Sequence, residues 1–230
     1  LLPGADDAPA PETLDQVIAR RVDFLTAYQN GAYAARYRAT IARVRRAEAS
    51  LNSEALTEAV ARTLFKLMAY KDEYEVGRLH MRSGFLDELK REFEDGFSVH
   101  YHLAPPLLPS RRDARGRPRK RAFGSWIQMP LAVLARLKPL RGTPFDPFGY
   151  NAERRAERAL IVWYEGVIAR LLDLLDAERL PDLVAIAQAP MEIRGYGPVK
   201  HEAIARVQPH AEKLLAELAS SEPAKQRATG

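Results

Sequence analysis

The spacing of apolar residues along the chain changes from a helical period to an alternating one and back again. Thr13-Leu14-Asp15-Gln16 places a hydroxyl three residues before an amide, which is the capping-box pattern of a helix start. Apolar residues follow at helical spacing as far as Asn30-Gly31. This dipeptide is either a turn between two helices, which we favour, or a weak point within one long helix.

Residues 53–81 predict the longest helix of the chain. We expect its buried stripe to consist of Leu56, Val60, Leu64, Leu67 and Met68. Glu58 with Arg62, and Lys71 with Glu75, stand four apart and are expected to pair on exposed faces. The charged residues between 66 and 78 are interpreted in the same way, as mutual pairs on a solvated helix face.

The period changes to two at residues 97–103, where apolar and polar side chains alternate, and this predicts a half-buried strand. The alternating stretch 117–123 is its nearest partner, in a hairpin with a long basic connection. Between the long helix and this strand, residues 85–93 predict a short helix that ends near Gly96.

Helical spacing returns in the second half of the chain, beginning with residues 126–137. Residues 141–150 predict an irregular loop whose aromatic side chains pack on the core, and Asn151 is expected to cap a long helix. Pro198 is expected to begin the last helix, and Pro209 to kink or split it. The sequence therefore predicts a mostly α fold, a multi-helix bundle-like domain with one short β-hairpin.

The composition is that of a globular protein: 47% of the 230 residues are hydrophobic and 28% are charged. No apolar run approaches the roughly 20 residues of a membrane span. We expect a linker at 1–12, a single domain at 13–219 and a flexible tail at 220–230. The missing initiator Met suggests a piece of a longer polypeptide. The chain has no cysteine, which excludes disulfides, a thiol nucleophile and an iron-sulfur cluster held by this chain, and favours a cytoplasmic location.

The positive net charge of +5 is concentrated in residues 111–121, where seven cationic side chains stand against Asp113. The candidates for binding a phosphate or an acidic partner are Arg111, Arg112, Arg117, Arg119, Lys120 and Arg121. A solvated connection, an acidic partner or phosphate, and nucleic acid remain open as interpretations of this segment. We do not expect nucleic acid, because no aromatic residue is available there for stacking on bases.

Other candidate sites are weaker. His100 and His102 share one face of the predicted strand at a spacing that metal sites use, and His80 could approach them. We assign no metal, because a third ligand is missing nearby in the sequence. Gly195-x-Gly197 is interpreted as a turn before a helix and not as a dinucleotide site. No catalytic residue is assigned.

Several runs resemble the C-terminal region of fused bacterial indolepyruvate ferredoxin oxidoreductases, members of the 2-oxoacid:ferredoxin oxidoreductase family. These runs are LTAYQ at 25–29, LFKLMAYKDEYEV at 64–76, HLAPP at 102–106, LRGTPFDPFGY at 140–150 and IRGYGPVK at 193–200. They extend over nearly the whole chain, and the runs at 64–76 and 140–150 are the most specific.

The resemblance implies a parent enzyme that oxidatively decarboxylates arylpyruvates to acyl-coenzyme A and reduces ferredoxin. Its cofactors would be thiamine diphosphate, Mg²⁺, an iron-sulfur cluster and coenzyme A, none of them held by this chain. The chain would be a non-catalytic structural or assembly domain whose partners are the other domains of the enzyme. The parent enzyme would in turn bind ferredoxin and could form a homo-oligomer. Residues 111–121 could assist in binding the phosphates of coenzyme A. The alternatives are a stand-alone interaction module that binds an acidic partner or nucleic acid through this segment, and a small metalloenzyme at His100 and His102.

Overall fold

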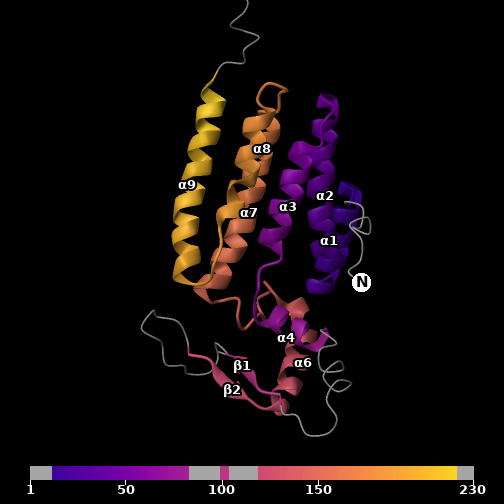
Figure 1. The fold of residues 1–230 in the computed structure, drawn as a ribbon, viewed down its shortest axis with the longest axis vertical. Coiled ribbons are helices and arrows are strands. Elements are labelled where there is room, and N and C mark those ends of the chain that lie inside the picture. Colours follow the sequence, from indigo (N-terminus) through magenta and orange to yellow (C-terminus); the bar gives the residue numbers. More distant parts are fainter. Residues whose placement is uncertain (1–11, 83–98, 104–118, 222–230) are drawn as a thin grey trace, which may run out of the picture.

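A computed structural model describes residues 12–82, 99–103 and 119–221. Long helices lie side by side in a bundle, and a smaller group of two short helices and a β-hairpin lies at one end of it (Figure 1). The helical bundle consists of α1 (Leu14–Tyr28), α2 (Gly31–Glu48), α3 (Ala55–Met68), α7 (Ala152–Asp173), α8 (Leu180–Gln188) and α9 (Pro198–Ser220). The small module consists of α4 (Glu73–Arg82), β1 (Tyr101–Leu103), β2 (Arg121–Phe123) and α6 (Gln128–Arg136). The prediction of a mostly α fold with one short hairpin is confirmed.

The first two helices begin where their capping residues predict. The Gln16 amide N–H donates to the Thr13 hydroxyl at 3.3 Å, and the Thr13 N–H donates to the Gln16 side chain at 2.9 Å. Asn30 accepts from the Tyr33 N–H at 2.9 Å and begins α2. The turn between two helices is therefore confirmed, and both starts follow from side chains that satisfy the free amide groups of a first helical turn.

The predicted helix over 53–81 is two helices, because the chain leaves the helical path after Met68 and resumes it at Glu73. Asp72 explains the new start, since its carboxylate accepts from the Glu75 N–H at 2.9 Å as a capping residue. The buried stripe from Leu56 to Met68 is confirmed. The pair of Glu58 with Arg62 is also confirmed, at 2.6 Å.

The second half of the bundle follows the predicted pattern closely. Asn151 caps α7 by accepting from the Glu153 N–H at 3.0 Å, and Pro198 stands in the first turn of α9. Pro209 does not split α9, which runs through it to Ser220. The loop at 141–150 buries Phe148 but leaves Phe145 80% and Tyr150 68% exposed, so the prediction that its aromatic residues pack on the core is wrong for these two.

The small module is built on α4 and α6, which pack along each other. Gly77 allows the close approach, because a Cβ atom there would lie 2.7 Å from the carbonyl oxygen of Leu131. In the predicted hairpin β1 and β2 pair antiparallel, with Tyr101 opposite Phe123, and both side chains join a small apolar cluster with Leu131 of α6. The strand is shorter at its start than expected, and the predicted helix at 85–93 and most of the basic connection lie outside the described residues.

The main core is formed between α1, α2, α3, α7, α8 and α9. Its largest fully buried side chains include Tyr28, Tyr37 and Tyr164. Each hydroxyl donates to a backbone carbonyl, so the polar end of each ring is satisfied inside the core. The helices of the described part of the chain include none that is long and apolar enough to cross a bilayer.

Candidate functional site

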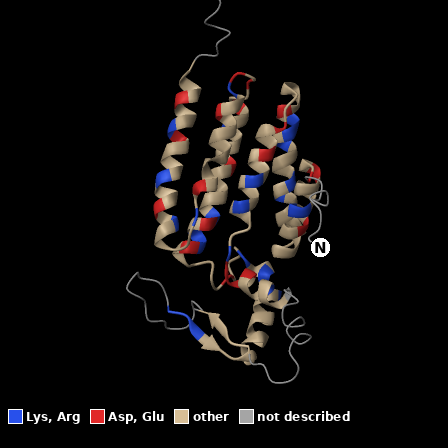
Figure 2. Ribbon diagram, viewed as in Figure 1, with Lys and Arg blue, Asp and Glu red and all other residues tan. Residues whose placement is uncertain are grey.

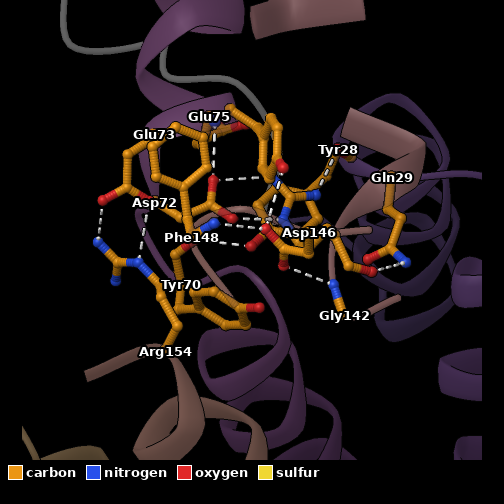
Figure 3. A network of polar contacts seen from close by, with 12 residues as sticks. Tyr28, Gln29, Tyr70, Asp72, Glu73, Glu75, Gly142, Asp146, Phe148 and Arg154 are labelled. Atoms are coloured by element: carbon orange, nitrogen blue, oxygen red, sulfur yellow. Dashed lines mark hydrogen bonds and ion pairs between the residues drawn. The ribbon is translucent and has the colours of Figure 1, made fainter. Parts of the chain in front are cut away.

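A network of polar contacts lies where the helical bundle meets the small module (Figure 3). Five segments contribute to it: the end of α1, the linker between α3 and α4, the first residues of α4, the loop that precedes α7, and the start of α7. The junction network consists of Tyr28, Gln29, Tyr70, Asp72, Glu73, Tyr74, Glu75, Arg141, Gly142, Asp146, Phe148 and Arg154.

Arg141 is the centre of the junction network, with a side chain only 2% exposed. Its Nε and Nη2 donate to the two carboxylate oxygens of Asp72 at 2.5 and 2.8 Å, and its Nη1 donates to the Tyr28 carbonyl oxygen at 2.8 Å. The guanidinium also lies over the Tyr28 ring, 3.7 Å from its centroid. A planar fork with two parallel donors is specific to arginine, so a lysine could not make these contacts.

The carboxylate of Asp72 makes two kinds of contact at once. It holds Arg141 and at the same time caps α4 through the Glu75 N–H. Its neighbour Tyr70 offers its carbonyl oxygen to the Tyr28 hydroxyl at 2.7 Å, so the linker before α4 is fixed to α1 on both sides of Lys71. The break after α3 is therefore produced by contacts with segments distant in the sequence.

Asp146 organises the loop that carries Arg141. Its carboxylate accepts from the N–H groups of Gly142 and Phe148 at 2.8 and 3.1 Å, and from the Tyr74 hydroxyl at 3.0 Å. Gly142 has φ +75°, a backbone conformation that glycine adopts without strain. The loop is thus shaped from within by one carboxylate and attached to α4 by one tyrosine.

Two further ion pairs involve α4, one with α7 and one within α4 itself. Arg154 of α7 binds Glu73 with two hydrogen bonds of 3.1 Å, and both side chains are less than 15% exposed. Arg78 binds Glu75 at 2.7 and 2.6 Å and lies over the Phe24 ring of α1. Glu75 therefore pairs with Arg78 and not with Lys71, and the predicted pair is wrong because Glu75 faces the interior.

The environment of the network favours the protonated form of its tyrosines and of Arg141. Burial raises the pKa of Tyr28 and Tyr74 well above the usual phenol value, and raises the pKa of Tyr70 to about 12. Burial alone would lower the pKa of Arg141, but the hydrogen bonds with Asp72 and the nearby phenols raise it overall. The phenols stay protonated and the guanidinium stays charged at neutral pH.

This arrangement is suited to holding segments of the chain in place and not to binding a ligand. The Asp72 and Arg141 side chains are buried, and each is already bound to groups of the same chain. Breaking such a pair leaves an uncompensated charge in the interior, so the pair fixes one relative placement of its segments. The junction network therefore orients the small module on the helical bundle.

The predicted basic candidates that the structure describes lie at the hairpin and not in the junction network. Arg119 and Lys120 precede β2, Arg121 begins it, and all three are exposed. The other three, Arg111, Arg112 and Arg117, lie outside the described residues.

His80 does not approach the face of β1 that carries His102. His102 points to the face of β1 opposite Tyr101, because successive side chains of a strand alternate. The His80 ring packs edge-on against the Tyr101 ring, with centroids 5.5 Å apart, and so approaches the other face. Within residues 12–82, 99–103 and 119–221, no group of three His, Cys, Asp or Glu side chains is placed to hold a metal ion.

The interpretation of the charged cluster at 66–78 as a solvated helix face is wrong. Asp72, Glu75 and Arg78 are buried, because the helix ends before them and α4 turns them toward the junction. One feature of the sequence does point to the residues of the junction network. The runs at 25–29, 64–76 and 140–150, which support the family resemblance, supply all residues of the junction network except Arg154.

Comparison with known proteins gives a family match over nearly the whole chain. A model described as a family of unknown function (DUF6537) matches residues 14–213, from the start of α1 into α9. No curated protein and no solved structure gives a significant match.

Proposed function

We propose that this chain, which belongs to the DUF6537 family, is a non-catalytic structural and assembly domain of a thiamine-diphosphate-dependent 2-oxoacid:ferredoxin oxidoreductase. The parent enzyme would act in the cytoplasm, convert indolepyruvate or related arylpyruvates to acyl-coenzyme A and pass electrons to ferredoxin. Thiamine diphosphate, Mg²⁺, the iron-sulfur cluster and coenzyme A would be bound by its other domains. This chain would pack against those domains and support their assembly.

The observation that supports the proposal is the location of the runs on which the family resemblance depends. Residues 25–29, 64–76 and 140–150 meet in a buried network whose charged groups are paired with one another. Groups that bind substrate or exchange protons need access to solvent or ligand, whereas Asp72 and Arg141 are 3% and 2% exposed in their side chains. Their placement supports a role in holding an orientation.

A second feature indicates where the small module would contact another domain. Between residues 125 and 137 the chain has one charged residue, Arg136, and α6 is almost entirely tan in Figure 2. Together with the residues that flank it, α6 presents an exposed apolar face that consists of Trp126, Met129, Val133 and Leu137, which are 64%, 77%, 48% and 39% exposed. A large apolar surface depleted of charge is typical of the buried centre of an interface. We assign this α6 face to contact with the catalytic domains.

Turnover measurements test the proposal. The purified chain 1–230 should not oxidise indolepyruvate in the presence of thiamine diphosphate, Mg²⁺, coenzyme A and a viologen acceptor, whereas the complete polypeptide should. Turnover by the separate chain would overturn the non-catalytic assignment. The residues encoded upstream of Leu1 give an independent check, because a thiamine-binding sequence is expected there and a nearby start codon would contradict the proposal.

The α6 face can be tested by adding charge to it. Met129→Glu combined with Val133→Glu should weaken the association of this chain with the remaining domains at least about tenfold, because two carboxylates would have to lose water in the contact. Val162→Glu is the matched control, since Val162 is 62% exposed but lies on α7, in the bundle. Equal association of the two variants would show that the α6 face is not the contact.

The alternative of a stand-alone module has one observation in its favour. Arg119, Lys120 and Arg121 form an exposed basic end of the hairpin, to which an acidic partner or nucleic acid could bind. A gel-shift assay with duplex DNA of arbitrary sequence at physiological salt tests whether this module binds nucleic acid. The enzyme-domain proposal expects no shift.

A further inference from the structure

An open groove of about 670 Å³ follows the seam between α1 and α2. It is formed by these two helices and the first residue of the turn that follows α2, so it lies on a side of the pair where no further described helix packs. The groove is lined by Asp15, Ile18, Ala19, Val22, Asp23, Arg38, Ile41, Ala42, Arg45, Arg46 and Ala49.

The spacing of these residues shows that the groove has the length of a helix. On each helix the lining positions recur at intervals of three and four, which marks one continuous face. From Arg38 to Ala49 this face extends about 16 Å along α2, which corresponds to about three helical turns. An elongated ligand that runs along the two helices would use all of it.

The floor of the groove is apolar and allows a close approach. Ile18 and Val22, both half-buried, form its centre together with Ile41, which is only 2% exposed, and Ala19 and Ala42 are small and exposed beside them. Small side chains let two helix backbones approach, and larger side chains of a third helix can then fill the space above them. This surface is suited to the apolar stripe of an amphipathic helix.

The two rims carry opposite charge, and the basic rim has the surplus. Arg45 of α2 already binds Asp15 of α1 and Glu54, although its Nε is buried without a hydrogen-bond partner. Arg38 and Arg46 are exposed, and neither forms an ion pair among the residues that the structure describes. Acidic side chains on a docked helix would therefore find unused cations on the α2 side.

We infer that this groove binds an amphipathic helix of about three turns, with its apolar stripe on Ile18, Val22 and the small side chains of Ala19 and Ala42, and with acidic residues beside Arg38 and Arg46. The inference rests on the proposed function for the source of the helix, which would be a neighbouring domain of the same enzyme. The groove is separate from the α6 face, because it lies on the helical bundle and not on the small module.

Peptide binding to the chain 1–230 tests this inference without the parent enzyme. The probes are two fluorescein-labelled, alanine-rich peptides of about 16 residues with leucines in one helical stripe and either glutamates or lysines along one flank. Fluorescence anisotropy should show the glutamate peptide binding at least about tenfold tighter than the lysine peptide. Arg38→Glu combined with Arg46→Glu should reverse this preference, and the control Arg43→Glu, on the same helix outside the groove, should not.

A second pair of variants locates the binding site. Ala42→Phe should weaken binding at least about tenfold by filling the floor, whereas Ala39→Phe, at an exposed position of α2 outside the groove, should leave it unchanged. Equal affinities for the two peptides, or equal effects of the two Phe variants, would overturn the inference. So would a dimer in sedimentation that Ala42→Phe abolishes, since a second copy would then be the occupant. None of these outcomes bears on turnover, which tests the proposed function separately.

Discussion

Replacing Arg141 by Met should be among the most destabilising single changes in this protein. The variant keeps an unbranched apolar stem but removes the guanidinium, which leaves Asp72 buried with a negative charge and the Tyr28 carbonyl without its donor. Breaking one side of a buried ion pair costs about 3–5 kcal/mol. That is a large part of the roughly 5–15 kcal/mol that stabilises a domain, and it corresponds to a fall of about 6–20 °C in Tm for a chain of this size.

A double-mutant cycle separates the ion pair from other effects of the substitution. Asp72→Asn removes the charge but keeps an oxygen that can accept from the Glu75 N–H and cap α4. The free energies of unfolding, measured by urea denaturation and far-UV circular dichroism, should show that the double variant loses about 1–3 kcal/mol less than the sum of the single losses. Additive losses would refute the coupling.

The control for this cycle is an ion pair of similar length on the surface. Arg62 and Glu58 lie 2.6 Å apart, but both side chains are about half exposed. Arg62→Met should change the free energy of unfolding by no more than about 0.5 kcal/mol, because solvent screens an exposed pair. If Arg141→Met cost as little as this control, the junction network would not be what holds the small module in place.

Three further changes probe other parts of the molecule. Gly77→Ala should cost about 1–3 kcal/mol in urea denaturation, because the new Cβ would lie 2.7 Å from the Leu131 carbonyl oxygen, and an unchanged midpoint would contradict the close packing of α4 on α6. Glu48→Ala should lower the free energy of unfolding by about 3 kcal/mol, because the buried carboxylate accepts from the N–H groups at the start of α3 and from the Thr57 hydroxyl. Glu48→Gln should lower it less, and equal losses in the two variants would exclude this capping role. Burial, with nearby cationic groups, lowers the pKa of Lys66 to about 8, so between about pH 8 and 10.5 the unfolded chain holds a proton that the folded chain has released. Stability should therefore rise with pH in that window, and Tm measured against pH should lose this rise in Lys66→Met.

Helix starts could be predicted because each depends on residues within one turn. Thr13 and Asn151 cap the helices that their positions predict, and Asn30, where the sequence predicts only a break, caps α2. The buried stripe of α3 could be predicted for the same kind of reason, since the helical period alone decides which side chains share a face.

The junction network could not be predicted, because its contacts join residues that are distant in the sequence. Asp72 and Arg141 are 69 positions apart, and neither position has a local pattern that indicates burial. The helical spacing of apolar residues continues across the break at 69–72, so the sequence alone places the charged residues between 66 and 78 on an exposed helix face. The exposure of Phe145 and Tyr150 was missed in a similar way, since side-chain type favours burial but the loop, shaped by Asp146, turns them outward.

The separation of Asp72 from Arg141 has a consequence for how the polypeptide matures on the ribosome. The helices up to α3 can collapse on one another as soon as they emerge, but α4 can take its final place only after the loop with Arg141 has been synthesised. Until then the nascent chain carries a carboxylate without its counter-ion beside a growing apolar core, which keeps that end open to water. Arrival of the guanidinium would close it before α7, α8 and α9 are synthesised, so the small module can be oriented while the second half of the bundle is still missing.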